Sequence, residues 1–304
     1  MLIVHDPRCA AYGSSLRPEQ PARILQTVPY LRAKHPDWEW LNPREVEVSD
    51  ATLLLAHSPA HLRRLPHPVD FDGDTPALPE IAAHARRAVG AALAAARHAW
   101  THGTPAFSLM RPPGHHATQD QAMGFCYLNQ IAVTALAMQE EMQAAAGTKA
   151  VGDSALGTTR ATIAVWDFDA HHGNGTQAIL RRRPGMFFAS VHQYPGYPGT
   201  GTEDDANCHN WPVPPHAPRL EHMAALRASW EAVLAFKPEL ILVSAGFDAY
   251  AQDPITALSL EAEDFAELGR WLGASPIPAA AILEGGYSTD LPQLIEAFLS
   301  AWVE

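Results

Sequence analysis

Short apolar runs recur along the chain, and each is followed by a polar or glycine-rich segment and then by a helical pattern. The runs are AFSLM at 106–110, ATIAVW at 161–166, MFFASV at 186–191, LILVSA at 240–245 and AAAIL at 279–283. Leu2 to His5 predicts a further strand at the start. Strands with apolar residues on both faces, alternating with helices, are typical of a mainly parallel sheet covered on both sides.

Helical patterns fill the intervals between these runs, with apolar residues at every third or fourth position. They span 79–100, 128–145, 219–236, 260–273 and 291–304. Proline concentrates in connections such as WPVPPHAP and YPGYPG, where we expect it to stiffen loops rather than interrupt strands. The segment 147–161 is typical of a flexible surface connection, but the strands on either side belong to one series. We therefore predict one α/β domain over residues 1–304, with a mainly parallel central sheet and helices on both faces.

Composition and charge narrow the class of protein. Hydrophobic residues make up 47% and charged residues 18% of the 304 positions, which is typical of a globular domain. The net charge of -12 argues against nucleic acid and anionic membranes as partners and favours cationic ones. Three widely spaced cysteines make a disulfide framework improbable, and no apolar run approaches the length of a membrane span. We expect a cytoplasmic protein without a targeting segment, and the sequence leaves its oligomeric state open.

Functional groups gather directly after the apolar runs. The segments there are RPPGHHA, DFDAHHGNG, HQYPGYPGTG, GFDAYAQD and EGGYS. In an open parallel sheet, ligands bind outside the carboxyl ends of the strands. We therefore expect the active site at this edge of the sheet.

A metal site is one interpretation of the segment DFDAH. Asp167, Asp169 and His171 stand two residues apart, so in an extended chain they share one face. This spacing alone leaves a metal site and a polar surface loop equally open. Asp248 supplies a second carboxylate from another strand end, although by itself it would more often cap a helix. Two oxygens, one nitrogen and an open position for water match the plan of a catalytic zinc site.

Two further segments offer proton transfer and oxyanion binding. His115 and His116 follow a Pro-Pro-Gly turn, and histidine suits general acid-base catalysis because its unperturbed pKa lies near neutrality. A pair of histidines in a chain with 16 of them is, taken alone, more often incidental. Tyr287 follows two glycines, and its hydroxyl could donate to a developing oxyanion. The alternative is a loop tyrosine packed on its neighbours.

Together these motifs resemble the histone deacetylase superfamily, which includes bacterial acetoin-utilisation proteins and acetylpolyamine amidohydrolases. The resemblance covers most of the chain, and it rests on the order and spacing of RPEQPARI, AHSPAHL, RPPGHHA, MGFCYLNQIAV, DFDAHHGNGTQ, SVHQYPGYPGTG, SAGFDAYAQDP and EGGYS. It implies an arginase/deacetylase-like fold.

The resemblance also implies a role for each matching residue. Asp169, His171 and Asp248 resemble the zinc ligands, and His116 resembles the general base and acid, with His115 held beside Asp167. Tyr287 resembles the residue that polarises the amide carbonyl with the zinc. Phe125 and Tyr197 resemble the aromatic walls of the acyl channel, and Gly124 resembles part of its lining. Asp74 resembles the carboxylate at its rim, and Ile255 is a further expected substrate-binding position. Arg23 resembles an arginine near an internal exit channel. A structural monovalent cation, usually potassium, is implied at Asp167, Asp169, His171, Ser190 and Val191.

One departure from the family pattern concerns Asn174, which stands where class I deacetylases usually carry an aspartate. The chain therefore resembles the class II enzymes. A neutral amide stabilises an imidazolium less than a carboxylate does, so we hypothesise that His116 is less basic than in class I relatives. An acidic limb of the pH-rate profile that lies no lower than in those relatives would contradict this.

The implied reaction is hydrolysis of an N-acyl amide, with acyl-lysine in a protein or peptide as the expected substrate. An acylated polyamine or other small acylated amine is the alternative, disfavoured because Ile255 stands in the region where a polyamine-selective relative carries a glutamate. A binding protein without catalytic activity is a third possibility. An arginase-type manganese hydrolase would be expected to offer more carboxylates than this sequence does.

Overall fold

A computed structural model of the protein describes residues 1–43, 48–149 and 160–304. Its strands form one sheet of eight, wholly parallel, in the order β2-β1-β3-β8-β7-β4-β5-β6. Their bounds are β1 Leu2–Val4, β2 Glu39–Leu41, β3 Ala106–Ser108, β4 Ile163–Asp167, β5 Met186–Gln193, β6 Cys208–Val213, β7 Leu240–Ala245 and β8 Ala279–Leu283. The predicted α/β class with a parallel sheet is confirmed.

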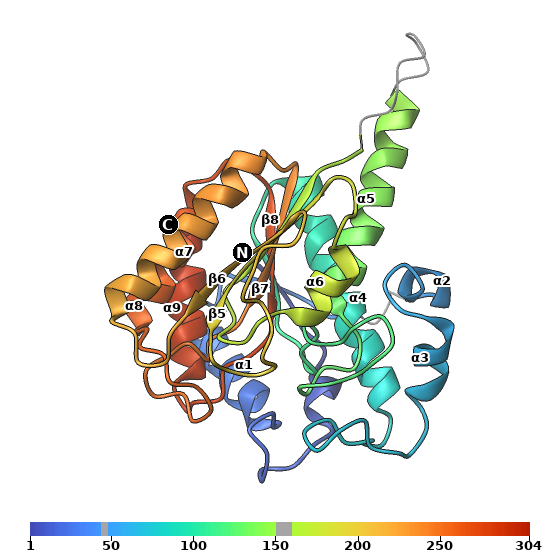
Figure 1. Ribbon diagram of the computed structural model, residues 1–304, viewed down its shortest axis with the longest axis horizontal. Coiled ribbons are helices and arrows are strands. Elements are labelled where there is room, and N and C mark those ends of the chain that lie inside the picture. The colour runs from blue at the N-terminus through green and yellow to red at the C-terminus, as the bar shows by residue number, and fades with distance from the viewer. Residues whose placement is uncertain (44–47, 150–159) are drawn as a thin grey trace.

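Helices cover both faces of this sheet (Figure 1). Their bounds are α1 Ala22–Lys34, α2 Asp50–Leu53, α3 Pro59–Arg64, α4 Ile81–His102, α5 Gln130–Lys149, α6 Asn174–Leu180, α7 Arg219–Phe236, α8 Ala262–Gly273 and α9 Leu291–Val303. In Figure 1, α4, α5 and α6 lie on one side of the sheet, and α1, α7, α8 and α9 lie on the other. The strands β4, β7 and β8 between them are buried along their whole length, which explains why their sequences are continuously apolar.

Some elements were not predicted from the sequence. They are the strands β2 and β6 and the helices α1, α2, α3 and α6. WPVPPHAP was expected to be a loop, but its first three residues end β6, where Pro212 pairs with His192 of β5. A proline is tolerated there because β6 is the last strand of the sheet and needs hydrogen bonds on one side only. Most of the predicted connection at 147–161 lies outside the described residues, and a single domain over 1–304 stays a prediction.

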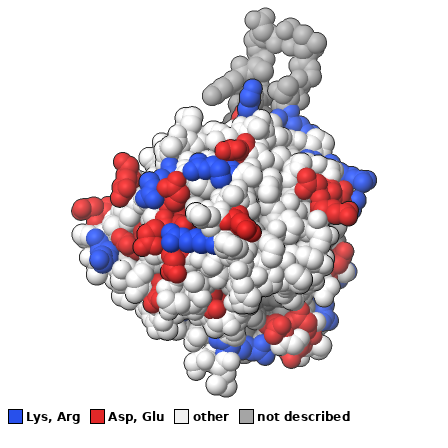
Figure 2. Space-filling view, turned by 60° about the vertical axis from the view of Figure 1, so that its left-hand side comes forward, with Lys and Arg blue, Asp and Glu red and all other residues white. Residues whose placement is uncertain are grey.

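The three cysteines are free, and all of them are buried. Acidic and basic side chains are interspersed on the α7 and α8 side of the molecule, which comes forward in Figure 2. Arg219 pairs there with Asp264, and Arg227 and Arg270 both pair with Glu267. None of the described helices combines the length and the apolar character needed to cross a bilayer.

The strand order explains where the functional groups meet. The five apolar runs identified in the sequence are adjacent in the sheet, as β3-β8-β7-β4-β5. Asp167 at the end of β4 lies opposite Ser190 of β5 on one side and Ser244 of β7 on the other. Because all the strands are parallel, the segments that follow them leave the same edge of the sheet.

His222 on α7 generates a prediction about stability. The residue is 1% exposed, and neither ring nitrogen has a hydrogen-bond partner within the part of the chain that the structure describes. Burial lowers its pKa to about 4. The unfolded chain takes up a proton near pH 6.5, whereas the folded chain resists it down to about pH 4. His222 therefore lowers the free energy of unfolding progressively as the pH falls through that window.

We expect His222→Leu to raise the free energy of unfolding, on the order of 1 kcal/mol, with a larger gain at pH 5 than at pH 8. Urea denaturation of both proteins at the two pH values measures this. An equal change at both pH values would show that protonation of His222 does not contribute.

Candidate active site

Three side chains with metal-ligating atoms meet beyond the ends of β4 and β7. Nδ1 of His171 lies 3.2 Å from Oδ1 of Asp169 and 2.9 Å from Oδ2 of Asp248. One ligand atom from each residue lies within 4.8 Å of the other two. Both carboxylates are buried, and the imidazole is only slightly exposed. The structure therefore brings together the three residues that the sequence analysis assigned to a metal.

Backbone N–H groups orient both carboxylates. The N–H of Gly285 donates to Oδ2 of Asp169 at 2.7 Å, and the N–H of Ala170 donates to Oδ1 of Asp248 at 2.9 Å. A side chain at Gly285 would collide with both carboxylates, so only glycine lets the backbone come this close. Such support fixes the direction of a ligand oxygen before any ion binds.

The two negative carboxylates of this cluster favour a positive charge between them. Burial disfavours a charged imidazole, yet the carboxylates of Asp248 and Asp169 outweigh it and raise the pKa of His171 to about 10. The two carboxylates thus hold one positive charge between them. A divalent ion fits the same position, because it can replace the proton on Nδ1 and be bound by all three side chains.

The tandem histidines lie beside this cluster, and each has a distinct partner. Nδ1 of His115 is 3.1 Å from Oδ2 of Asp167, and Nδ1 of His116 is 2.8 Å from Oδ1 of Asn174. Burial disfavours a charged His115, but Asp169 and Asp167 raise its pKa to about 10. For His116, burial and the neighbouring imidazoles of His115 and His171 lower the pKa. The two rings are therefore electrostatically unlike, with His116 the neutral one.

The contact between His116 and Asn174 is the one on which the basicity hypothesis depends. A lower basicity of His116 than in class I relatives stays a prediction.

Tyr287 follows β8 and is held from several sides. Gly286 before it has a φ of 114°, a conformation that side-chain-bearing residues rarely adopt. The guanidinium of Arg23 lies 4.9 Å from the centre of the Tyr287 ring, and its Nε donates to the carbonyl of Gly286 at 2.7 Å. The edge of the ring meets Phe125, with 5.8 Å between the ring centres.

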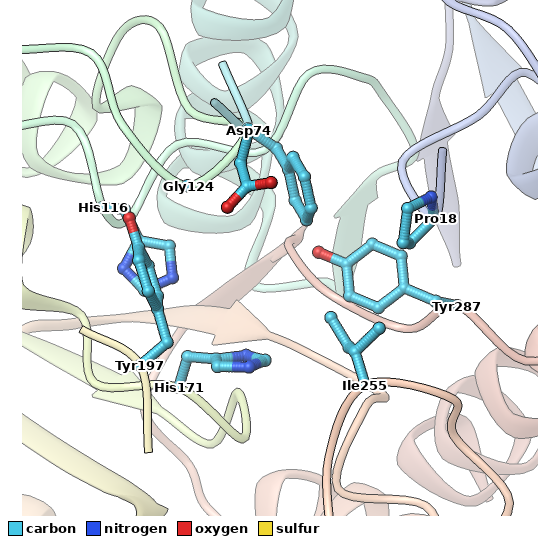
Figure 3. Close-up of a pocket in the computed structure, with 9 residues that line it drawn as sticks. Pro18, Asp74, His116, Gly124, His171, Tyr197, Ile255 and Tyr287 are labelled. Carbon is cyan, nitrogen blue, oxygen red and sulfur yellow. The ribbon is translucent and has the colours of Figure 1, made fainter. Parts of the chain in front are cut away.

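These groups line a pocket of about 260 Å³. Its lining residues are Pro18, Asp74, His116, Gly124, Phe125, His171, Tyr197, Ile255 and Tyr287. In Figure 3 the Tyr287 hydroxyl and the Asp74 carboxylate point into the cavity, and the ring of His171 lies across it from Asp74. The sequence analysis named all of these except Pro18, which belongs to the RPEQPARI motif but carries no reactive group.

Gly124 and Phe125 form the tip of a tight hairpin, in which Met123 and Cys126 exchange backbone hydrogen bonds of 3.0 and 2.9 Å. Both tip residues have positive φ, 57° for Gly124 and 68° for Phe125. A side chain at Gly124 would collide with His116 and Tyr197. A positive φ is costly for an aromatic residue, so the surrounding structure must hold Phe125 in this conformation. Its N–H donates to Oγ1 of Thr75 at 3.1 Å, which ties the hairpin to the loop of Asp74.

The residues predicted for potassium also lie together, since Ser190 is opposite Asp167 in the sheet. Oγ of Ser190 is 2.9 Å from Nδ1 of His192, and Val191 is fully buried. A potassium ion at this place stays a prediction.

Two buried carboxylates of the site were not identified from the sequence. Glu284 at the end of β8 accepts hydrogen bonds from the backbone of Gly114 at 2.6 Å and His115 at 3.2 Å. Asp253 accepts from the backbone of Tyr287 at 2.7 Å. Both belong to motifs noted in the sequence, EGGYS and AQDP, but their partners are mainly backbone amide groups, which all residues except proline carry. Glu284 also accepts from the hydroxyl of Ser244 at 3.4 Å.

Comparison with known proteins identifies the family. The histone deacetylase domain matches residues 17–302. The chain belongs to the histone deacetylase family. A probable deacetylase from Methanothermobacter thermautotrophicus is 32% identical over 305 residues, covering 95% of this chain and 86% of that protein. An acetylpolyamine amidohydrolase from Mycoplana ramosa is 37% identical over 211 residues, covering 65% of this chain and 54% of that protein.

A solved structure supports the same assignment. The HDA15 HD domain superposes with a TM-score of 0.85 at 26% identity, covering 100% of this chain and 91% of that one. The family and the arginase/deacetylase-like fold implied by the sequence motifs are thus confirmed. The chain is a deacetylase-family amidohydrolase, a hydrolase that acts on amides.

The ligand cluster yields a prediction about metal binding. We expect Asp248→Asn to weaken divalent-metal affinity on the order of 100-fold, because it removes one of two anionic ligands. Asp264→Asn is the matched control, since Asp264 is also a buried carboxylate that accepts a backbone N–H, at the start of α8. Metal analysis after dialysis against a graded chelator gives both affinities. Equal affinity in the two variants would remove Asp248 from the ligand set.

Proposed function

We propose that the protein is a zinc-dependent lysine deacylase, which hydrolyses the N-acyl amide of acyl-lysine in proteins or peptides. The observation that carries the proposal is the geometry of one pocket, at which the cluster of Asp169, His171 and Asp248, the imidazole of His116 and the hydroxyl of Tyr287 converge. Zn²⁺ held by Asp169, His171 and Asp248 would supply Lewis acidity toward the amide carbonyl and toward water. The family relationship supports this chemistry, and a potassium ion beside Asp167 is proposed as a structural companion.

His116 has the arrangement of a general base. The amide oxygen of Asn174 can only accept a hydrogen bond, so it fixes the proton of the neutral imidazole on Nδ1. Nε2 is then the basic nitrogen, free to take a proton from the attacking water. The low pKa imposed by burial and by neighbouring imidazoles favours passing that proton on to the leaving amine.

Tyr287 is the proposed donor to the developing oxyanion. Its hydroxyl points into the pocket in Figure 3, and burial raises its pKa well above the usual range, so it remains a proton-bearing donor at neutral pH. A donor that is already held in place stabilises the transition state without a free-energy cost for reorienting it during the reaction.

Phe125 and Tyr197 suit the walls of a channel for an alkyl chain. Tyr197 meets His116 edge-on at 5.1 Å between ring centres, and Phe125 meets Tyr287 in the same manner. Flat aromatic faces bind methylene groups and leave little room for branched or bulky chains. A linear acyl-lysine side chain fits this description.

The substrate assignment depends on the rim of the pocket. Asp74 is the carboxylate of the pocket lining beyond the metal cluster, and Ile255 adds a half-exposed apolar surface. A single carboxylate suits one backbone N–H of a peptide substrate or one positive charge. A polyamine carries additional ammonium groups along its length, which would need further acidic partners. The Mycoplana ramosa relative, named an acetylpolyamine amidohydrolase, keeps a small acylated amine as the second candidate substrate.

Tyr287→Phe tests the mechanism. Loss of one oxyanion donor is expected to lower kcat on the order of 100- to 1000-fold while the metal content is unchanged. Steady-state kinetics on a fluorogenic acyl-lysine peptide, together with metal analysis, measures both. Turnover equal to that of the wild type would remove Tyr287 from the mechanism.

A comparison of substrates tests the specificity. We expect kcat/KM for an acetyl-lysine peptide to exceed that for N-acetylputrescine, and Ile255→Glu to shift the ratio toward N-acetylputrescine by adding a carboxylate at the rim. A wild-type preference for N-acetylputrescine would favour the second candidate. Bound metal without turnover on acetyl, lactyl or longer acyl-lysine peptides, or on acylated amines, would instead identify a binding protein.

A further inference from the structure

We infer that Asp253 is a positioning residue, which sets the place of the oxyanion donor Tyr287 through a hydrogen bond to its backbone. The inference rests on the proposed function, because it assigns a second residue to the step in which Tyr287 acts. Asp253 touches neither the pocket nor the metal cluster, so its effect is transmitted through its two hydrogen-bond partners.

Each oxygen of the Asp253 carboxylate accepts one backbone N–H group. Oδ2 accepts from Tyr287 at 2.7 Å, and Oδ1 accepts from Ile255 at 3.1 Å. Both donors belong to residues that line the pocket, and Figure 3 shows Ile255 next to the Tyr287 ring. One buried carboxylate therefore links the segment after β7 to the segment after β8 at the point where each reaches the pocket.

This carboxylate is kept where a charge is costly. Asp253 is 6% exposed, and burial together with the charge of Asp248 raises its pKa to about 7. Among the described residues no arginine, lysine or histidine forms an ion pair with it. Neutral backbone donors are thus its direct partners. If packing were the only requirement at this position, an apolar side chain would avoid the free-energy cost of burying a carboxylate.

The segment of Tyr287 needs such a restraint. Two glycines, Gly285 and Gly286, precede it, and glycine leaves the backbone a wide choice of conformations. Arg23 holds the carbonyl oxygens of Glu284 and Gly286, which lie before Tyr287. Asp253 accepts a hydrogen bond from the N–H of Tyr287 itself, and this bond fixes the direction in which the side chain leaves the loop.

Two variants of graded severity test the inference. The side chain introduced by Asp253→Asn has one acceptor oxygen for two N–H groups, and that introduced by Asp253→Ala has none. We expect kcat to fall on the order of 10-fold for the first and 100-fold for the second, because a displaced donor stabilises the transition state less well. Asp264→Asn, the same change at a buried carboxylate on α8, should keep wild-type turnover.

A double-mutant cycle separates positioning from general support of the fold. If Asp253 acts through the Tyr287 hydroxyl, Asp253→Ala should cost little in a Tyr287→Phe background, within about threefold, because the group it positions is already absent. If Asp253 only stabilises the fold, Asp253→Ala lowers kcat by the same factor in both backgrounds, and the inference is wrong.

Hydrogen exchange gives a readout that needs no turnover. We expect faster exchange in peptides covering 285–288 for Asp253→Ala than for the wild type, and no change there for Asp264→Asn. Unchanged exchange at 285–288 in Asp253→Ala would overturn the inference even if kcat falls. Should Asp253→Ala not fold, Asp253→Asn replaces it in both measurements. Wild-type protein without turnover contradicts the proposed function alone, and the exchange experiment still decides the role of Asp253.

Discussion

Two buried carboxylates converging on one imidazole nitrogen are the constraint on which the rest of the site depends. Asp169 and Asp248 come from neighbouring strands, and without a positive charge between them their repulsion in a water-poor environment would be prohibitive. The fold meets this cost with backbone donors from Gly285 and Ala170 and with a position that a divalent ion fits. The parallel sheet matters because it delivers both carboxylates, and the groups around them, to the same edge.

Around this centre, the reactive side chains depend on backbone conformations that local sequence preference does not favour. Phe125 is held at positive φ at the tip of a hairpin, and Tyr287 follows a glycine in an extreme conformation. Such conformations persist because distant side chains accept hydrogen bonds from the backbone there. Oγ1 of Thr75 accepts from Phe125, and Asp253 accepts from Tyr287. Residues such as Thr75 and Asp253, which take no direct part in the proposed reaction, therefore position the side chains that do.

This division explains what could be predicted from the sequence. The buried strands β4, β7 and β8 were predictable because both of their faces are apolar, and Asp169, His171 and Tyr287 because side-chain chemistry at strand ends leaves a recognisable pattern. The edge strand β6 was not, since only Cys208 and Val213 of its six residues are buried and one of the others is a proline. Asp253 and Glu284 were not identified because they accept hydrogen bonds from backbone amide groups. Such partners do not depend on side-chain identity, so they produce no recognisable sequence pattern.

The pocket is also layered in a way that bears on specificity. Its floor consists of segments that directly follow buried strands, where a change in one residue disturbs the ligand cluster. Its rim includes Pro18, Asp74 and Ile255, whose side chains line the pocket but do not belong to the ligand cluster. Rim residues can therefore change while the ligand cluster is kept, as is general where one fold carries sites of different specificity. Asp253 nevertheless links Ile255 of the rim to Tyr287 of the floor, so a substitution at Ile255 that shifts its backbone would also displace the proposed oxyanion donor.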